Sequence, residues 1–214
     1  MALIHRAKIR PSKMELIAGW LPSRPWYAGG ADPEVQLLGS YRFDDPAGEV
    51  GLDTHLVLAD GAQILQVPMT YRAAPLEGGE PWLINTTEHT VLGKRWVYDA
   101  CGDPVYANAL AAAILAGGVQ AEEYFEVDGR REFRTPTAQV TGSGDRTQQL
   151  ATVDTVADLS SSTDGAVTTI RAAGWELSIN RVIDLKADAA GDNTLTGTWS
   201  DQATPVVLAT ARLT

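Results

Sequence analysis

The sequence predicts an α+β fold built mainly from antiparallel β-sheets with two short-to-medium helices. Short segments of alternating apolar and polar residues fill most of the chain, and turn signals such as Asp60-Gly61 separate them. Only two segments, residues 13–21 and 105–116, carry apolar residues at helical spacing. The chain has 214 residues, which is enough for one large domain or two small ones.

The first part of the chain predicts a strand, a helix and then further strands. Residues 2–10 alternate, and Ser12 with Glu15 forms a capping box for a helix that stops before Pro22. Pro68 predicts an edge position or a bulge in its strand. The strands expected after the first helix cover residues 34–43, 49–59, 62–72, 83–86 and 91–98.

A second helix is expected in the middle of the chain, followed by strands alone. Asp103 as N-cap and Pro104 at the first helical position begin this helix, and Gly117-Gly118 ends it. The strands expected after it cover residues 121–127, 131–140, 149–159, 166–172, 175–184, 193–199 and 204–213. Two segments rich in Ser, Gly and Asp, residues 142–147 and 160–165, are expected as loops.

Charge and composition exclude several classes of protein. The net charge of −10 repels a phosphate backbone, so nucleic-acid binding is not expected. No apolar run reaches the roughly 20 residues that span a membrane, and the N-terminus has no signal-peptide core. Cys101 is the one cysteine, so no internal disulfide can form. These features predict an acidic cytoplasmic protein that binds neither nucleic acid nor membrane.

One segment near the N-terminus resembles a known family. Trp20, Arg24, Trp26, Tyr27 and Gly29 match the W…RWYAG element of maltokinases, with an extra proline between the arginine and the second tryptophan. A β-hairpin and a Leu/Ala-rich helix follow this element, as in the N-terminal cap of that family. The five residues are expected to have a structural role in a maltokinase-cap-like fold.

The resemblance implies a cap-like domain at residues 1–117. Residues 118–214 are expected as an antiparallel β subdomain, and a degenerate kinase N-lobe is one interpretation of it. Asn180 and Arg181 stand where such a lobe needs its nucleotide-binding lysine. The large lobe that supplies the base and the Mg²⁺ ligands in maltokinases has no counterpart in a chain of this length. The resemblance therefore implies a kinase-derived architecture without kinase activity.

The candidate recognition surface lies on the two strands near residue 90. A histidine beside a carboxylate suits acid–base chemistry, but neighbouring strand residues point to opposite faces, so a structural histidine stays open as the alternative. For the whole candidate surface, an ordinary solvated strand face stays open as the alternative. The candidate surface consists of Glu88, His89, Lys94, Arg95, Trp96 and Tyr98.

No catalytic residue, metal site or cofactor is expected. The three histidines lie far apart in the sequence, and paired acids such as Asp44-Asp45 are adjacent and do not face each other. The first functional hypothesis is a non-catalytic interaction or regulatory protein with a protein partner in maltose, trehalose or α-glucan metabolism. The alternative is a small-molecule binder for a sugar or a sugar phosphate. The oligomeric state is left open.

Overall fold

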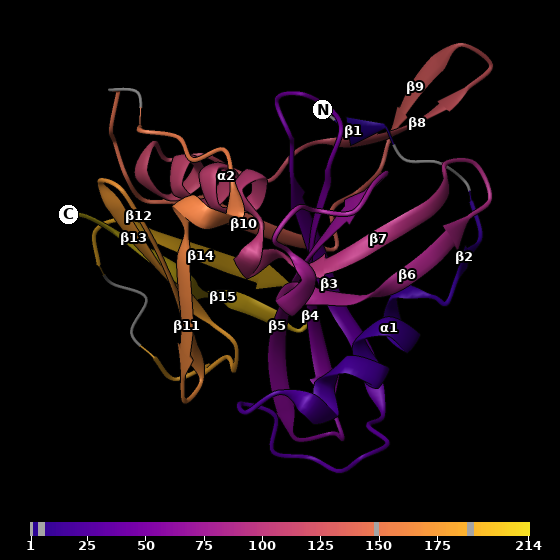
Figure 1. The fold of residues 1–214 in the computed structure, drawn as a ribbon, viewed down its shortest axis with the longest axis horizontal. Coiled ribbons are helices and arrows are strands. Elements are labelled where there is room, and N and C mark those ends of the chain that lie inside the picture. Colours follow the sequence, from indigo (N-terminus) through magenta and orange to yellow (C-terminus); the bar gives the residue numbers. More distant parts are fainter. Residues whose placement is uncertain (1, 4–6, 148–149, 188–190) are drawn as a thin grey trace.

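Antiparallel sheets make up most of the fold. The computed structural model describes residues 2–3, 7–147, 150–187 and 191–214. These residues form two six-stranded sheets, one three-stranded sheet and two α-helices. Figure 1 shows how the sheets and helices are arranged. Among the described strands one pair, β1 with β8, is parallel, and the other pairs are antiparallel. The predicted α+β class is confirmed.

The first six-stranded sheet, the cap sheet, has the order β2-β6-β7-β5-β4-β3. Helix α1 (Lys13–Trp20) precedes most of it, with Ser12 and Glu15 forming the expected capping box. Asp60 and Gly61 adopt positive φ angles of 51° and 64° in the turn between β4 and β5, as that dipeptide predicts. The strands are β2 (Ile9–Arg10), β3 (Val35–Phe43), β4 (Gly51–Ala59), β5 (Gln63–Arg72), β6 (Leu83–His89) and β7 (Gly93–Asp99).

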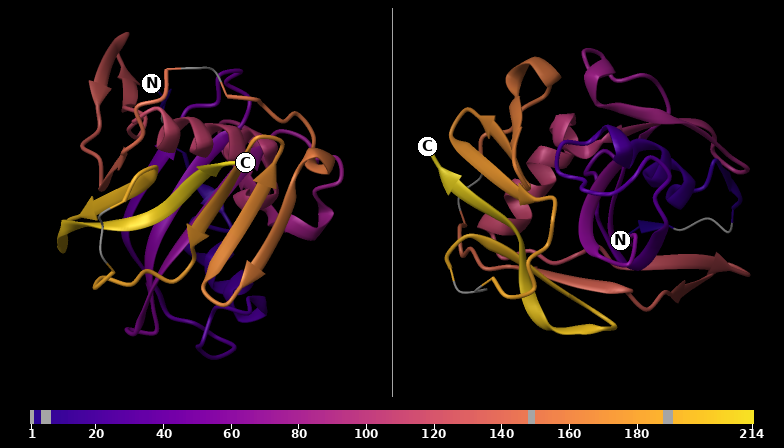
Figure 2. Two further views of the ribbon diagram at one scale, coloured as in Figure 1. Left: turned by 90° about the vertical axis from the view of Figure 1, so that its left-hand side faces the viewer. Right: turned by 90° about the horizontal axis from the view of Figure 1, so that it is seen from below.

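The second six-stranded sheet, the C-terminal sheet, has the order β10-β14-β15-β13-β12-β11. Helix α2 (Pro104–Leu115) lies across one face of it, as both views in Figure 2 show. Asp103 caps α2 by accepting a hydrogen bond from the Val105 amide at 3.0 Å. The strands are β10 (Ala138–Gly142), β11 (Ser160–Asp164), β12 (Val167–Ala172), β13 (Trp175–Asn180), β14 (Thr194–Trp199) and β15 (Gln202–Leu213).

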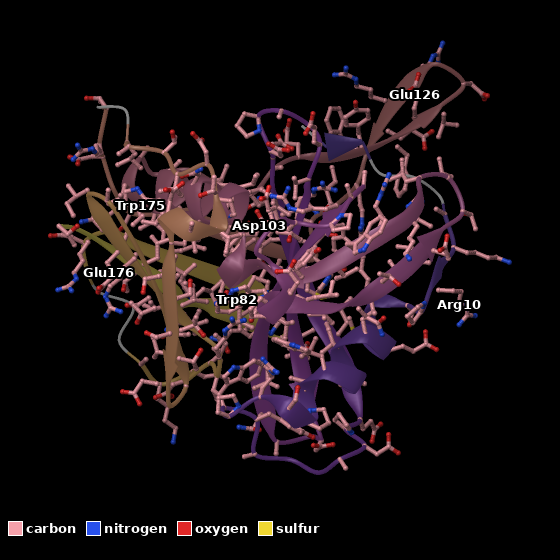
Figure 3. The ribbon with its side chains drawn as sticks, in the orientation of Figure 1. Arg10, Trp82, Asp103, Glu126, Trp175 and Glu176 are labelled. Carbon is pink, nitrogen blue, oxygen red and sulfur yellow. The ribbon has the colours of Figure 1, made fainter. Side chains whose placement is uncertain are left out.

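A small sheet and several 3₁₀ turns complete the fold. The hairpin of β8 (Glu123–Val127) and β9 (Arg130–Phe133) extends away from the body, and Figure 3 places Glu126 on it. β1 (Ala2–Leu3) pairs with β8. The 3₁₀ turns are η1 (Leu21–Ser23), η2 (Glu80–Trp82), η3 (Ala100–Gly102) and η4 (Val156–Asp158).

Three of the expected strands are wrong, and one expected loop is a strand. In the strand expected at residues 2–10, residues 4–6 lie outside the described residues, and the two ends form β1 and β2, which pair with different sheets. The strand expected at 131–140 is interrupted between β9 and β10, because its two ends pair with different sheets. In the strand expected at 149–159, residue 149 lies outside the described residues, and the remainder forms η4 and loop.

The loop expected at residues 160–165 is instead strand β11. Its Ser and Thr side chains are short and polar, and β11 is an edge strand, so few of them need burial. Its whole length pairs with β12, from Ser160 opposite Arg171 to Asp164 opposite Val167. Cross-strand pairing therefore overrides the local loop preference of these residues.

The cap sheet buries both of its faces. On one face, here called the α1 face, Val57, Leu65 and Val67 pack in one cluster with α1 residues such as Ile17 and Trp20. On the opposite face, the α2 face, cap-sheet residues share a larger cluster with α2 and the C-terminal sheet. The boundary expected between residues 117 and 118 therefore lies beside a core that both segments share. Their division into separate folding units stays a prediction.

Pro68 lies where β5 changes its partner. Residues 69–72 of β5 pair with β7, whereas the amide of Gln66 donates to the carbonyl of Arg181 at 2.9 Å. Since consecutive strand amides alternate in direction, the nitrogen of residue 68 points to the same side as that of Gln66. The proline, which has no N–H, thus falls between two partners where no donor is required.

Arg181 and Asp99 form a buried ion pair between the two sheets. The guanidinium, which is 1% exposed, donates to both oxygens of Asp99 at 2.8 and 2.7 Å. It also donates to Thr168 Oγ1 at 2.8 Å and lies 5.5 Å from the ring centre of Trp26. Burial opposes the charge on Arg181, but Asp99 outweighs it and raises the pKa of the guanidinium. The Arg181 side chain therefore has a structural role. It is not the phosphate-binding residue that its sequence position suggested.

Two further side chains reinforce this junction. Gln66, which is 1% exposed, donates to the carbonyls of Asn180 and Leu208 and accepts from Tyr41. Arg72 makes two hydrogen bonds to Asp103, at 2.7 and 2.6 Å, and so joins the end of β5 to the start of α2. Figure 3 shows Asp103 at this junction, near Trp82.

Replacing Arg181 with Met leaves the Asp99 carboxylate buried without its cation. We expect the free energy of unfolding to fall by about 3–5 kcal/mol, measured by urea denaturation at pH 7. The double variant Arg181→Met/Asp99→Asn should recover much of this loss, because no unpaired charge remains. Arg171→Gln removes a half-exposed ion pair with Glu176 and should have a much smaller effect. Equal losses in Arg181→Met and Arg171→Gln would contradict the role given to Arg181.

Candidate functional site

A cavity of about 660 Å³ opens on the α1 face of the cap sheet, beside α1. Its walls come from β3, β4, β6 and β7 and from the base of the β8–β9 hairpin. The lining is dense in charge, with four basic side chains and five carboxylates. These are Lys13, Arg42, Arg95, Arg134, Asp44, Asp45, Glu49, Asp53 and Glu123.

Asp53 forms the centre of the charged cluster in this cavity. Its carboxylate accepts from Lys13 Nζ at 2.5 Å, and Arg42 Nε lies 3.7 Å from its other oxygen. Burial opposes ionisation of Asp53, but the two cations outweigh burial and hold its pKa well below its usual range. Lys13 also lies 5.3 Å from the ring centre of Tyr71. Asp53 is therefore ionised and is the counter-ion of two basic side chains.

His55 lies next to this cluster and is 2% exposed. Neither ring nitrogen has a hydrogen-bond partner among the described residues. Burial lowers the pKa of His55 to about 3, with a further contribution from Lys13, and Asp53 offsets only part of it. The imidazole is therefore neutral over the physiological range and adds no charge to the cluster.

The predicted recognition residues are divided between two faces of the β6–β7 hairpin. His89 and Arg95 line the cavity on the α1 face. Glu88, Lys94 and Trp96 lie on the other face, where Glu88 pairs across the strands with Lys94, and Lys94 lies 4.9 Å from the Trp96 ring. Tyr98 is 2% exposed, and its hydroxyl accepts from the Leu76 amide. The six residues therefore do not form one surface.

His89 has a structural contact within its turn. Its Nδ1 accepts from the amides of Val91 and Leu92 at 3.2 and 3.0 Å. Glu88 and His89 point to opposite faces, as alternation along the strand predicts. The pair therefore does not cooperate in proton transfer, although His89 still contributes to the cavity wall.

The cap-motif residues hold the loop after α1 against the core. Trp20 and Trp26 are buried and make an edge-to-face contact at 5.6 Å, and Arg24 lies 4.9 Å from the Trp20 ring. The Tyr27 hydroxyl donates to Asp60 at 2.5 Å, which ties the loop to the β4–β5 turn. A Cβ at Gly29 would overlap both members of this hydrogen bond. The structural role expected for these residues is consistent with these contacts.

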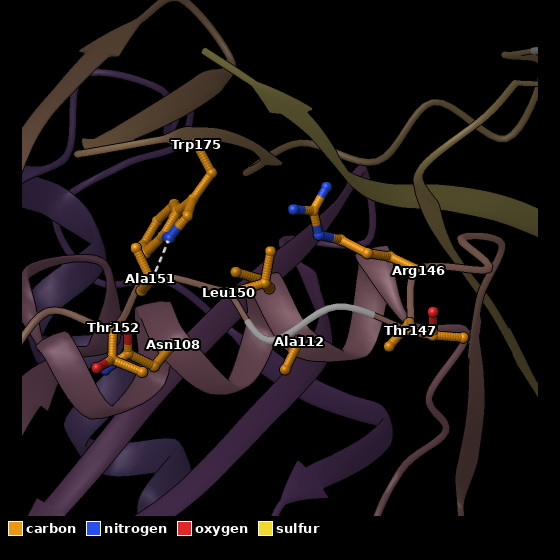
Figure 4. A pocket seen from close by; sticks show the side chains of 10 residues that line it. Asn108, Ala112, Arg146, Thr147, Leu150, Ala151, Thr152 and Trp175 are labelled. Atoms are coloured by element: carbon orange, nitrogen blue, oxygen red, sulfur yellow. Dashed lines mark hydrogen bonds between the residues drawn. The ribbon is translucent and has the colours of Figure 1, made fainter.

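A second, smaller hollow of about 340 Å³ lies between α2 and the C-terminal sheet. Figure 4 shows its lining, where the indole of Trp175 donates to the carbonyl of Ala151 at 2.8 Å. Most of its wall is apolar, with alanines of α2 and Leu150. The cavity on the α1 face is the better candidate site, because it brings charged donors and acceptors together.

Metal and thiol chemistry receive no support from the described residues. No group of three or more His, Cys, Asp and Glu side chains there is arranged to hold a metal ion. Cys101 is fully buried, and burial raises the pKa of its thiol. No helix in the described part of the chain is long and apolar enough to cross a membrane.

Sequence reasoning missed Lys13, Arg42 and Asp53 as site residues. The alternation of residues 51–57 does place Asp53 and His55 on one face with Val57, which is a core residue. Two ionisable side chains on the apolar face of a strand were therefore the available signal. Lys13 was harder to find, because its contact with Asp53 joins residues 40 positions apart.

The depressed pKa of His55 predicts acid sensitivity. The unfolded chain binds the proton near pH 6.5 and the folded chain near pH 3, so stability is full above pH 6.5 and falls as the pH drops. Between pH 7.5 and pH 5 we expect a loss of about 2 kcal/mol from this group. Urea denaturation of His55→Gln should show a correspondingly smaller difference between the two pH values. The same pH dependence in both proteins would contradict the assignment.

Comparison with known proteins bears on the first half of the chain. Residues 20–103 match the family model of the maltokinase N-terminal cap domain. No curated protein matches the chain. The matched segment begins at Trp20 and ends at the N-cap of α2, so it covers β3 to β7 with their turns and includes neither α2 nor the C-terminal sheet. Residues 20–103 are therefore a maltokinase N-terminal cap-like domain.

Proposed function

We propose that this chain acts by binding and not by catalysis, and that its ligand is a sugar or a sugar phosphate held in the cavity on the α1 face. The observation that carries the proposal is the lining of that cavity, where guanidinium donors, carboxylate acceptors and the hydroxyl side chains of Ser40 and Thr87 occur together. Sugar hydroxyls donate and accept hydrogen bonds, so a mixed lining suits them. A volume of about 660 Å³ is in the ordinary range of small-molecule sites.

The ionised state of Asp53 argues against one catalytic role, that of a general acid. A carboxyl group that protonates a leaving group needs a raised pKa, as in glycoside hydrolysis. The pKa of Asp53 is instead lowered, because Lys13 and Arg42 hold it as the anion. The cap-like domain supports placing the protein in the cytoplasm and in maltose, trehalose or α-glucan metabolism, and both statements are part of the proposal.

The test is a binding measurement with a cavity variant. Calorimetry with glucose, maltose, trehalose and their phosphates should give saturable binding of at least one ligand. Arg95→Gln should weaken that binding about tenfold, since it removes a charged donor. The fold should tolerate the change, because among the described residues Arg95 makes one hydrogen bond, to the neighbouring Lys94 carbonyl. Arg171→Gln on the C-terminal sheet is the matched control. If none of these ligands produces a heat of binding, the proposal of a sugar-binding cavity is wrong.

A second candidate function is association with a protein partner from α-glucan metabolism. The β8–β9 hairpin favours it, since every residue of β9 is exposed and Phe133 is 59% exposed. Arg131 and Tyr124 stack at 4.7 Å on the same hairpin. Exposed aromatic and arginine side chains are typical of interface centres.

Phe133→Ser tests this candidate. The immobilised protein should retain one or more α-glucan enzymes from lysate, and the variant should lose them while keeping the melting temperature of the parent. Leu213→Ser, at a comparably exposed position on the C-terminal sheet, is the control and should retain the same proteins. Equal recovery with Phe133→Ser and with the parent would exclude the hairpin as the contact.

A further inference from the structure

Most of the carboxylates that line the cavity on the α1 face are already engaged. Asp45 accepts from the backbone amides of Ala47, Glu49 and Val50 at 2.8–3.0 Å. Glu123 pairs with Arg134 at 3.1 Å, Asp53 pairs with Lys13, and Asp44 is also engaged. Four of the five carboxylates in the lining thus have partners already.

The two basic side chains beside Asp53 are less completely satisfied. Lys13 and Arg42 share the single carboxylate of Asp53, and Arg42 makes no hydrogen bond to it. Arg42 Nε is buried without a hydrogen-bond partner among the described residues, in a side chain that is 17% exposed. His55, which is neutral, adds no negative charge beside them. Two cations against one anion leave this end of the cavity with an excess of positive charge.

An anionic, oxygen-rich group complements that excess. Phosphate offers three acceptor oxygens, and a guanidinium matches its geometry with two donors at once. The overall charge of −10 and the acidic rim oppose the approach of such a group at long range. The affinity must therefore come from short-range contacts, and Lys13 and Arg42 are the side chains positioned to make them.

We propose that Lys13 and Arg42 form a phosphate subsite at the Asp53 end of this cavity, so that the ligand is a phosphorylated sugar. This inference rests on the proposed sugar-binding function. Asp53 then acts as the counter-ion that holds both cations in place when the subsite is empty. Arg95, on β7, lines the same cavity and in this proposal contacts the sugar.

Calorimetry with glucose, glucose 1-phosphate, glucose 6-phosphate and inorganic phosphate tests the subsite. In the parent protein at least one sugar phosphate should bind about tenfold or more tightly than glucose. Arg42→Gln should remove that gain, so that the sugar phosphate then binds no more tightly than glucose does to the same variant. Arg42→Lys should keep part of the gain, and Arg171→Gln should keep all of it. Urea denaturation of Arg42→Gln checks the fold, in which Lys13 still neutralises Asp53.

The possible results separate the two proposals. Equal affinity for glucose and its phosphates would overturn the subsite and leave sugar binding standing. Retention of the phosphate gain in Arg42→Gln, and also in Lys13→Gln, would overturn the assignment to these residues. If inorganic phosphate and both sugar phosphates bind with equal affinity, the phosphate subsite is supported and a contribution of the sugar to binding is excluded. If the parent protein binds none of the four ligands, both the phosphate subsite and the proposed sugar binding are wrong.

Discussion

The buried ion pair of Arg181 and Asp99 is the contact on which the arrangement of the two large sheets depends. A guanidinium that is 1% exposed requires an anion beside it, so the end of β7 and the segment after β13 must stay together. The same side chain contacts Thr168 of β12 and the Trp26 ring of the cap motif. Arg181, which lies beyond the segment that matches the family model, therefore also contacts the aromatic loop inside that segment.

This junction determines which face of the cap sheet is available for binding. The α2 face is filled by the core shared with α2 and the C-terminal sheet. The α1 face is covered by a helix of 8 residues, about 12 Å long, whereas the ten residues of β5 extend over about 33 Å. A short helix cannot cover long strands, so part of the α1 face remains open as the cavity.

Local signals predicted much of the fold, and contacts distant in sequence explain what they missed. The capping box, the Asp60-Gly61 turn and the Asp103 N-cap all depend on neighbouring residues, and all are present. The strand β11 was missed because its pairing with β12 overrides a loop-like composition. The site was missed for a similar reason, since the contact of Lys13 with Asp53 joins residues 40 positions apart. The division of the β6–β7 residues between two faces, by contrast, follows from alternation along each strand.

The polar groups of the α1 face are difficult to explain by stability alone. Among the described residues, neither ring nitrogen of His55 has a hydrogen-bond partner, and the buried Nε of Arg42 also has none. Each such group carries a desolvation cost of roughly 1–3 kcal/mol, and apolar side chains of similar size would avoid it. Departures from local stability of this kind are expected at binding sites, where the missing partner is the ligand. Of these two residues Arg42 lines the cavity, so its desolvation cost is the one that supports a ligand at this position.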